Sequence, residues 1–151
     1  TSQLALIREC AIPAIRLGNL ASVRDWGYAP DYVKGMIMIN EAKIATDYVM
    51  ATNTVTSVRE FFKASAIAAG FSPEFEGDGM NERCICKNTS KVLCEVDEKY
   101  FRPSDVNYLR GDYSKIQKEL GWRPTTSLET MTEKMVISDI EIARAGHSHS
   151  F

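Results

Sequence analysis

Two arginines in predicted loops have the chemistry and the spacing to bind an anion. Arg24 follows a turn at Gly18 and Asn19, and Arg102 lies in the loop sequence Y-F-R-P-S-D. A guanidinium group offers a planar fork of N–H donors that matches phosphate oxygens. Two such loops brought together would bind a diphosphate, and Asp105 could accept hydrogen bonds from the ring N–H groups of a base.

The same arginines also have a purely structural interpretation. Arg24 could pair with Asp25 or Asp31, and Arg102 could pair with a carboxylate of its own loop. Ion pairs at such short spacings are common on protein surfaces and contribute little. Spacing alone favours this second interpretation, so a binding role needs support from elsewhere in the sequence.

Familiar catalytic patterns are missing from the sequence. No G-x-G-x-x-G motif follows a predicted strand, so no dinucleotide-binding turn is visible, and there is no P-loop. His147 and His149 both lie in a polar C-terminal tail, which leaves no plausible Ser-His-Asp set. No tyrosine is followed four residues later by lysine. We therefore predict no catalytic residue within the chain.

The cysteines give little support for a metal site. A zinc site needs about four ligands, and the two histidines that could contribute lie in the tail. Reduced thiols in a cytoplasmic protein are the simpler interpretation, so we predict no metal. The four cysteines are Cys10, Cys84, Cys86 and Cys94.

The composition is typical of a single soluble globular domain. The chain has 151 residues, of which 44% are hydrophobic and 25% are charged, and its net charge is −2. This charge gives no general attraction to nucleic acid or to an anionic membrane surface. No apolar run approaches the length of a membrane span. We expect neither nucleic acid nor a membrane as a partner.

The first third of the chain is predicted to contain two helices and a short strand. Apolar residues at helical spacing predict a helix over 2–12, and an apolar strand follows over 14–18. Asp31 is placed to cap a second helix over 32–42. The apolar residues of this second helix are dense enough to predict that it is largely buried.

The next segment predicts a strand followed by a helix. Residues 47–52 have the composition of a buried strand. Ser57 and Glu60 form a capping box, and Gly70 is placed to end the helix that begins there. Such a βα unit requires a parallel sheet to join.

The remaining elements follow from turn and cap signals. A second capping box at Thr126 and Glu129 begins the last helix, whose apolar stripe includes Met131, Met135 and Ile142. The other predictions are a loop over 71–82, a hairpin over 83–96 that turns at 87–91, a loop over 97–112, and helices over 114–120 and 128–145, the first ended by Gly121.

Four stretches in one collinear order resemble the GDP-mannose 4,6-dehydratase family of the extended short-chain dehydrogenases/reductases. They are LGNLASVRDWGYAPDYV, DYVMAT, SVREFF and VDEKYFRPSDVNYLRGDYSKIQKELGWRPTTSLETMTEKMV. The R-D-W motif recurs in related nucleotide-sugar dehydratases, whereas the long last string points to the GDP-mannose enzymes. NERCICKNTSKV is also similar to eukaryotic-type members. The resemblance covers nearly the whole chain.

The resemblance implies a set of substrate-binding residues. Arg24 and Arg102 match the arginines that contact the nucleotide diphosphate in that family, and Gly18 and Asn19 match a turn that borders the nucleotide. Asp105 stands where the family usually has a glutamate near the guanine. The aspartate keeps the charge but is one methylene shorter, which weakens the case for guanine recognition through it.

The resemblance also implies an α/β fold that corresponds to only part of the family's full-length enzyme. The chain resembles the C-terminal substrate-binding part of an extended short-chain dehydrogenase/reductase, with the strand–helix unit 47–70 belonging to the Rossmann sheet. Residues 1–151 would form a single nucleotide-sugar-binding region that lacks the N-terminal NADP-binding Rossmann half. The family's glycine-rich turn, Tyr-x-x-x-Lys pair and catalytic Thr and Glu all precede the point that Thr1 matches.

The implied function is part of the conversion of GDP-mannose to GDP-4-keto-6-deoxymannose, on the route to GDP-fucose. NADP would be held by the missing half, and the chain alone is expected to be inactive. GDP-mannose is the expected ligand, and the full-length enzyme could form a homo-oligomer. Two alternatives stay open. One is a non-catalytic truncated homologue that binds a nucleotide sugar or an intact partner, and the other is a different nucleotide-sugar epimerase or dehydratase.

Overall fold

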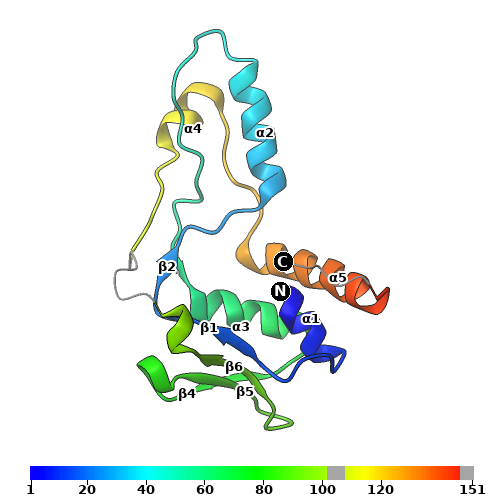
Figure 1. Ribbon diagram of the computed structural model, residues 1–151. Coiled ribbons are helices and arrows are strands. Elements are labelled where there is room, and N and C mark those ends of the chain that lie inside the picture. The colour runs from blue at the N-terminus through cyan, green and yellow to red at the C-terminus, as the bar shows by residue number, and fades with distance from the viewer. Residues whose placement is uncertain (102–107, 147–151) are drawn as a thin grey trace.

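The body of the protein is a small mixed sheet covered by helices (Figure 1). The computed structural model describes residues 1–101 and 108–146. The sheet has the order β1-β6-β5-β4, in which β1 runs parallel to β6 and the other pairs are antiparallel. A separate antiparallel ribbon joins β2 to β3. The strands are β1 (Ile15–Leu17), β2 (Val23–Arg24), β3 (Thr56–Ser57), β4 (Pro73–Glu76), β5 (Arg83–Cys86) and β6 (Val92–Val96).

The helices form two groups (Figure 1). Helices α1, α3 and α5 lie together beside the sheet, whereas α2 and α4 stand with the segment 41–52 in an arm that projects away from it. Within the described residues, every helix is too short or too polar to cross a bilayer. The α-helices are α1 (Ser2–Arg8), α2 (Ala29–Asn40), α3 (Val58–Ala68), α4 (Ser114–Leu120) and α5 (Leu128–Arg144), and two 3₁₀ turns are η1 (Gly79–Asn81) and η2 (Glu98–Tyr100).

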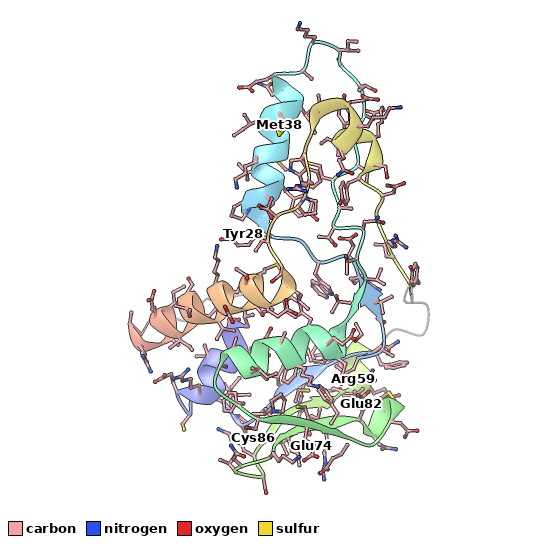
Figure 2. The ribbon with its side chains drawn as sticks, turned by 180° about the vertical axis from the view of Figure 1, so that it is seen from behind. Tyr28, Met38, Arg59, Glu74, Glu82 and Cys86 are labelled. Atoms are coloured by element: carbon pink, nitrogen blue, oxygen red, sulfur yellow. The ribbon has the colours of Figure 1, made fainter. Side chains whose placement is uncertain are left out.

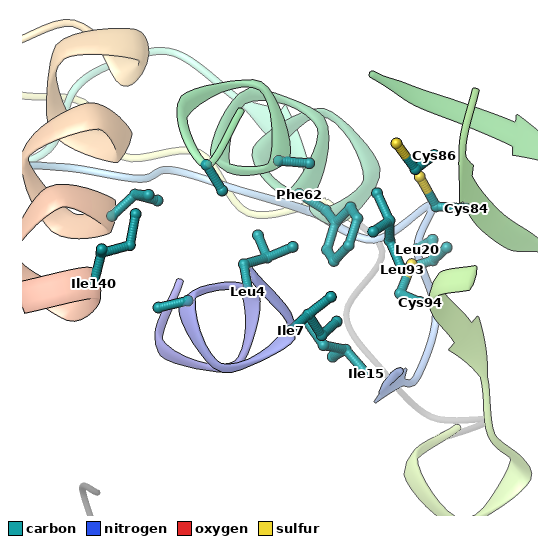
Figure 3. Close-up of a cluster of buried hydrophobic side chains, with 14 residues drawn as sticks. Leu4, Ile7, Ile15, Leu20, Phe62, Cys84, Cys86, Leu93, Cys94 and Ile140 are labelled. Atoms are coloured by element: carbon teal, nitrogen blue, oxygen red, sulfur yellow. The ribbon is translucent and has the colours of Figure 1, made fainter. Parts of the chain in front are cut away.

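The hydrophobic core lies between the sheet and the three helices of the body (Figure 3). Leu4 and Ile7 enter it from α1, and Phe62 enters it from α3. On β5 the side chains alternate, so that Cys84 and Cys86 point inward. Burial of these apolar groups is the main stabilising contribution to the body.

Several sequence-based predictions are confirmed. The chain is α/β, the hairpin turns at 87–91 between β5 and β6, and α4 spans the predicted 114–120. Gly121 follows α4 with φ 75°, the left-handed conformation that ends a helix and that glycine adopts at least cost. Ser57 and Glu60 make both hydrogen bonds of the capping box at the start of α3.

One helix boundary and one strand in the body differ from the prediction. The first helix stops at Arg8 and not at residue 12, because Cys10 takes φ 59° and the Ala11 N–H donates to the Leu6 carbonyl at 2.8 Å. Strand β4 lies within 71–82, which was predicted to be a loop. Its sequence, Pro-Glu-Phe-Glu, is short, begins with a proline and has no β-branched residue, so it carried little strand signal, and pairing with β5 makes it an edge strand.

The prediction of a buried strand over 47–52 is wrong for this chain. No strand pairing is present there among the described residues, and Val49 is 56% exposed. A strand needs a neighbour to satisfy its backbone hydrogen bonds, and the described part of the chain offers none to this segment. Helix α3 is instead preceded by β3, which pairs antiparallel with β2. The sheet of the body is mixed, and its one parallel pair is β1 with β6.

Helix α2 differs from the prediction in its cap and in its burial. The helix begins at Ala29 after Tyr28, so Asp31 lies inside its first turn and is not its N-cap. Val33, Met36 and Ile37 are each more than half exposed, although the helix was predicted to be largely buried. Its apolar residues form an exposed stripe because the arm has no layer packed on that side among the described residues.

The last helix matches the prediction in position but not in its cap. Ser127, and not Thr126, is the N-cap, and its hydroxyl accepts a hydrogen bond from the Thr130 N–H at 3.2 Å. Met131 is buried as predicted, whereas Met135 is 39% exposed. The buried stripe continues instead through Val136 and Ile140.

Candidate nucleotide-binding site

Arg24 lies on β2, at the edge that faces the chain segment following residue 107. Its Nη1 donates to the Val23 carbonyl at 2.8 Å, and its side chain is half-buried. The Ser22 carbonyl accepts from the Val58 N–H on the β3 side. Because successive carbonyls of a strand point to opposite sides, the Val23 carbonyl points away from β3. Tyr108 forms a parallel bridge with Val23 on that side.

The turn at Gly18 and Asn19 holds the chain that leads toward residue 102. A Cβ atom on Gly18 would lie 2.3 Å from the Tyr100 carbonyl oxygen, so only glycine permits this approach. The Leu17 carbonyl accepts from the Asp97 N–H at 2.8 Å, which extends the contact toward β6. The Asn19 side-chain oxygen accepts the N–H two residues on at 2.9 Å and closes the turn.

The segment 17–25 therefore contacts the described chain on both sides of 102–107. Gly18 lies against Tyr100, and Val23 pairs with Tyr108. Arg102 and Asp105 themselves fall within 102–107, outside the described residues. The meeting of the two arginine loops, and with it the contact between Arg24 and Arg102, therefore stays a prediction.

Asp25 is a connecting residue that the sequence patterns did not mark as functional. Its carboxylate accepts hydrogen bonds from the Thr52 N–H at 2.7 Å, the Thr52 hydroxyl at 2.6 Å and the Asn53 N–H at 3.0 Å. It also accepts the Gly111 N–H at 3.2 Å. Three chain segments therefore meet at this one side chain. The Asp in the R-D-W motif, directly after the candidate arginine, was the available signal.

Trp26 completes the motif by joining β2 to the body. Its ring stacks on Phe61 of α3, with ring centroids 4.4 Å apart. The indole N–H donates to the Thr56 carbonyl at 3.0 Å, so the polar end of the ring is also satisfied. The three residues of R-D-W thus have separate tasks: the arginine is at the strand edge, the aspartate joins segments, and the tryptophan fixes the strand to α3.

Asp25 and Asp31, the two carboxylates considered as partners of Arg24, each make other hydrogen bonds. Asp25 is engaged as described above, and Asp31 accepts hydrogen bonds from Thr125 and Thr126 in the segment before α5. Burial alone would raise the pKa of Asp31, but these hydrogen bonds outweigh burial and lower that pKa. Asp31 is therefore an anchor for the 125–126 segment and not a cap for α2.

A strong ion pair fixes α3 to the sheet. Arg59 donates through Nε and Nη2 to the two carboxylate oxygens of Glu82, the second at 2.8 Å. Figure 2 shows the two side chains pointing toward one another between the helix and the strands. The hydrogen bond to Glu82 raises the pKa of Arg59, so the guanidinium stays charged. It positions the start of α3, and with it β3, against the body.

The cysteines are free thiols in the body and not a metal centre. Cys84 and Cys94 face one another across β5 and β6 and are fully buried. The hydrogen bond with Cys84, together with burial, raises the pKa of Cys94. No group of three or more His, Cys, Asp or Glu side chains could hold a metal within 1–101 and 108–146.

The sequence profile of the family described as GDP-mannose 4,6 dehydratase matches residues 1–135. The chain belongs to the GDP-mannose 4,6-dehydratase family. It is 42% identical to the GDP-mannose 4,6 dehydratase of Cricetulus griseus over 85% of this chain and 34% of that protein. It is 38% identical to the GDP-mannose 4,6-dehydratase of Vibrio cholerae serotype O1, over 96% of this chain and 42% of that protein. The chain thus spans about a third to two fifths of the length of these relatives.

Solved structures show the same fold in a wider group of proteins. RMD from Pseudomonas aeruginosa complexed with NADPH matches with a TM-score of 0.72 and 13% identity, over 93% of this chain and 40% of that chain. UDP-glucose 4-epimerase from Bifidobacterium longum in complex with NAD+ and UDP matches with a TM-score of 0.68 and 19% identity, over 98% of this chain and 40% of that chain. At these identities the likeness establishes the extended short-chain dehydrogenase/reductase fold of this dehydratase-family chain.

The described residues of this family member do not fit a nicotinamide dinucleotide. Such a cofactor needs a glycine-rich turn between a parallel strand and a helix, where backbone N–H groups meet the pyrophosphate. In the described chain, β3 passes into α3 through Ser57 with no glycine between them, and its partner β2 is antiparallel. Among the named strands of the described residues, only β1 and β6 pair in parallel, and they are followed by turns that lead to β2 and to η2 and not to such a helix.

Proposed function

We propose that this chain is the substrate-binding half of a GDP-mannose 4,6-dehydratase and that its ligand is GDP-mannose. The observation that carries the proposal is the placement of Arg24 on β2, whose neighbour Val23 pairs with Tyr108, while Gly18 in the preceding turn lies against Tyr100. Arg102 lies two residues after Tyr100 in the sequence. The two guanidinium groups would bind the diphosphate, and Asp105 would face the guanine.

We further propose that residues 1–151 are one region that works with an upstream NADP-binding half. The relatives are more than twice as long as the matched segment, which supports this view. The exposed stripe on α2 and the unpaired segment 47–52 also support it, because both present surfaces that a further layer would cover. In this arrangement the segment 47–52 would become a strand of the upstream sheet.

An open apolar cavity beside α1 is a further surface that an upstream half could cover. It has a volume of about 450 Å³ and lies between the start of α1, the end of α5 and the face of α3 that carries Phe61, with Trp26 after β2 also in its wall. Its walls are mostly apolar, so it does not resemble a phosphate site. The chemistry of dehydration would take place in the upstream half, and the residues of this chain would bind and orient the nucleotide.

We place the protein in the cytoplasm. The four cysteines are free thiols, and Cys84 and Cys94 stay unbridged although they are paired across adjacent strands. A reducing compartment keeps such thiols free. The nucleotide-sugar ligand proposed here agrees with that compartment.

Calorimetric titration of GDP into the chain tests the binding role. Arg24→Ala and Arg102→Ala should each weaken GDP affinity by roughly ten- to a hundredfold, the loss of one charge-assisted contact. Lysine at either position should restore only part of the affinity, because an ammonium group cannot form the planar fork. Arg83→Ala is the matched control, since Arg83 pairs with Glu76 on the far edge of the sheet. Wild-type affinity in both alanine variants would contradict the proposal.

A further inference from the structure

A third arginine, Arg110, lies beside the strand that carries Arg24. Tyr108 bridges β2 in the parallel direction, and the Gly111 N–H donates to Asp25, which directly follows β2. The backbone of Arg110 lies between these two contacts. Residues 108–111 therefore run alongside β2 and the turn after it, and the family resemblance assigned them no role.

The side chain of Arg110 is held by a residue in an unusual conformation. Its Nε donates to the Asn53 side-chain oxygen at 2.8 Å. Asn53 has φ 59°, and its own N–H donates to Asp25 at 3.0 Å. Asparagine adopts the left-handed conformation more readily than other non-glycine residues, and the hydrogen bond to Asp25 helps to hold it here. Asp25 thus fixes the residue that orients the guanidinium.

The rest of the guanidinium group is available to a ligand. The side chain of Arg110 is exposed, and its two Nη atoms donate no hydrogen bond to any residue of 1–101 or 108–146. Asp112 is the nearest carboxylate in sequence, and its oxygen accepts from the Ser114 N–H at 2.9 Å and from the Ser114 hydroxyl. These hydrogen bonds lower the pKa of Asp112, and the charge of Arg110 contributes to the same shift without a direct ion pair between the two described side chains. The carboxylate is therefore engaged at the start of α4.

Gly111 is closely packed against Ala51 and Asp25. A Cβ atom on Gly111 would lie 2.2 Å from the Cβ of Ala51, and 3.6 Å from a carboxylate oxygen of Asp25. Ala51 is buried, and the Thr52 beside it donates twice to Asp25. The carboxylate of Asp25 therefore acts as the common acceptor that sets residues 51–53 and 110–111 against one another.

We propose that Arg110 is an additional anion-binding residue of this site and that Asp25 is its positioning residue. The ligand chemistry is the phosphate oxygens of a nucleoside diphosphate, so the proposal rests on the function proposed above. Arg110 supplies two Nη groups that make no hydrogen bond to the described residues, and Asp25 connects Asn53 and Gly111, on either side of this guanidinium, to the end of β2, which carries Arg24.

Titration of the chain with GDP and with guanosine tests the role of Arg110. Arg110→Ala should weaken GDP affinity about three- to tenfold, less than a buried contact because the group is exposed. Guanosine affinity should not change, since guanosine carries no phosphate. Wild-type GDP affinity in Arg110→Ala, together with weakened affinity in Arg24→Ala, would overturn this inference and leave the proposed function standing. No GDP binding by the wild type would overturn the proposed function and this inference together.

Amide hydrogen exchange of the free chain tests the role of Asp25 without any ligand. Asp25→Asn keeps the shape but loses the charge, and its amide presents a donor to N–H groups that need an acceptor. Exchange at Asn53 and Gly111 should therefore become faster, and Asp25→Glu should restore part of the protection. Unchanged protection in Asp25→Asn would overturn the positioning role whether or not GDP binds.

A double-mutant cycle separates positioning from a general structural effect. In a background of Arg110→Ala, the further change Asp25→Asn should weaken GDP affinity less than it does in the wild type, because one of the groups that it positions is gone. A purely structural role predicts equal losses in the two backgrounds. Equal losses would therefore overturn the link between Asp25 and Arg110.

Discussion

Replacing Asp31 tests whether its carboxylate is an anchor between two distant segments. The side chain is 3% exposed, and it accepts from the Thr125 N–H at 3.0 Å, the Thr125 hydroxyl at 2.8 Å and the Thr126 N–H at 2.9 Å. Asp31→Ala removes the acceptor of all three. The segment that joins α4 to α5 then loses its hydrogen bonds to the Asp31 side chain and keeps the one that the Trp122 indole donates to the Asp31 carbonyl.

The magnitude follows from the donors left without a partner. A buried donor deprived of its acceptor costs about 1–3 kcal/mol. Thr125 is exposed and Thr126 is partly exposed, so water can replace part of the loss. We therefore expect Asp31→Ala to lower the free energy of unfolding by about 2–4 kcal/mol, and Asp31→Asn by about half of that. A helix N-cap in the same place would cost only about 1 kcal/mol.

The pH dependence gives an independent check. The hydrogen bonds from Thr125 and Thr126 hold the pKa of Asp31 below its ordinary value of 3.8. A carboxyl with a lowered folded-state pKa stabilises the fold above the unfolded-state value, and this contribution is lost as pH falls through the folded-state pKa. The difference in unfolding free energy between wild type and Asp31→Asn should therefore be full at neutral pH and shrink as pH falls below 3.8.

Urea unfolding followed by tryptophan fluorescence is the suitable assay, because the buried Trp122 lies beside the anchor. Asp78→Ala is the matched control: Asp78 precedes η1, makes no side-chain cap, and should change stability by less than about 0.5 kcal/mol. A loss of about 1 kcal/mol or less in Asp31→Ala, with no pH dependence of the difference between wild type and Asp31→Asn, would refute the anchor role.

Three further outcomes are expected. Glu82→Gln should lower the free energy of unfolding by about 1–3 kcal/mol, because Arg59 loses a charged partner, and a change below about 0.5 kcal/mol in urea unfolding would contradict this. If Asp105 accepts hydrogen bonds from guanine, GDP should bind better than ADP. Asp105→Asn should reduce this preference by about 1–3 kcal/mol, whereas Asp105→Glu should keep it. Equal discrimination between GDP and ADP in wild type and Asp105→Asn would place base recognition elsewhere. The chain alone, given GDP-mannose and NADP, should show no turnover, and product above a no-protein control would mean that these 151 residues contain a catalytic set after all.

Local signals in the sequence determined much of the secondary structure. Ser57 and Glu60 satisfy the first N–H groups of α3 among themselves, so the helix start could be predicted without any tertiary contact. Gly121 ends α4 because it alone accepts the left-handed conformation cheaply. The R-D-W and Y-F-R-P motifs identified the family, and the sequence comparison confirms it.

Tertiary structure decided what these motifs do. Nothing in the sequence showed that Asp25 would join residues 52–53 to Gly111, because its partners lie far along the chain and contribute mainly backbone N–H groups. Asp31 had the signature of a cap, yet a segment 94 residues away supplies its partners.

The predictions of a strand over 47–52 and of a buried α2 were wrong because both depend on contacts with distant parts of the chain. The segment 47–52 has a strand-like composition, but a strand exists only when a neighbouring backbone pairs with it, and the described chain supplies none. Helix α2 carries enough apolar residues to be buried, but burial depends on what lies against them, and Val33 and Ile37 remain exposed. Sequence determines which groups can bond locally, whereas partners distant in the chain are set only when the fold brings them together.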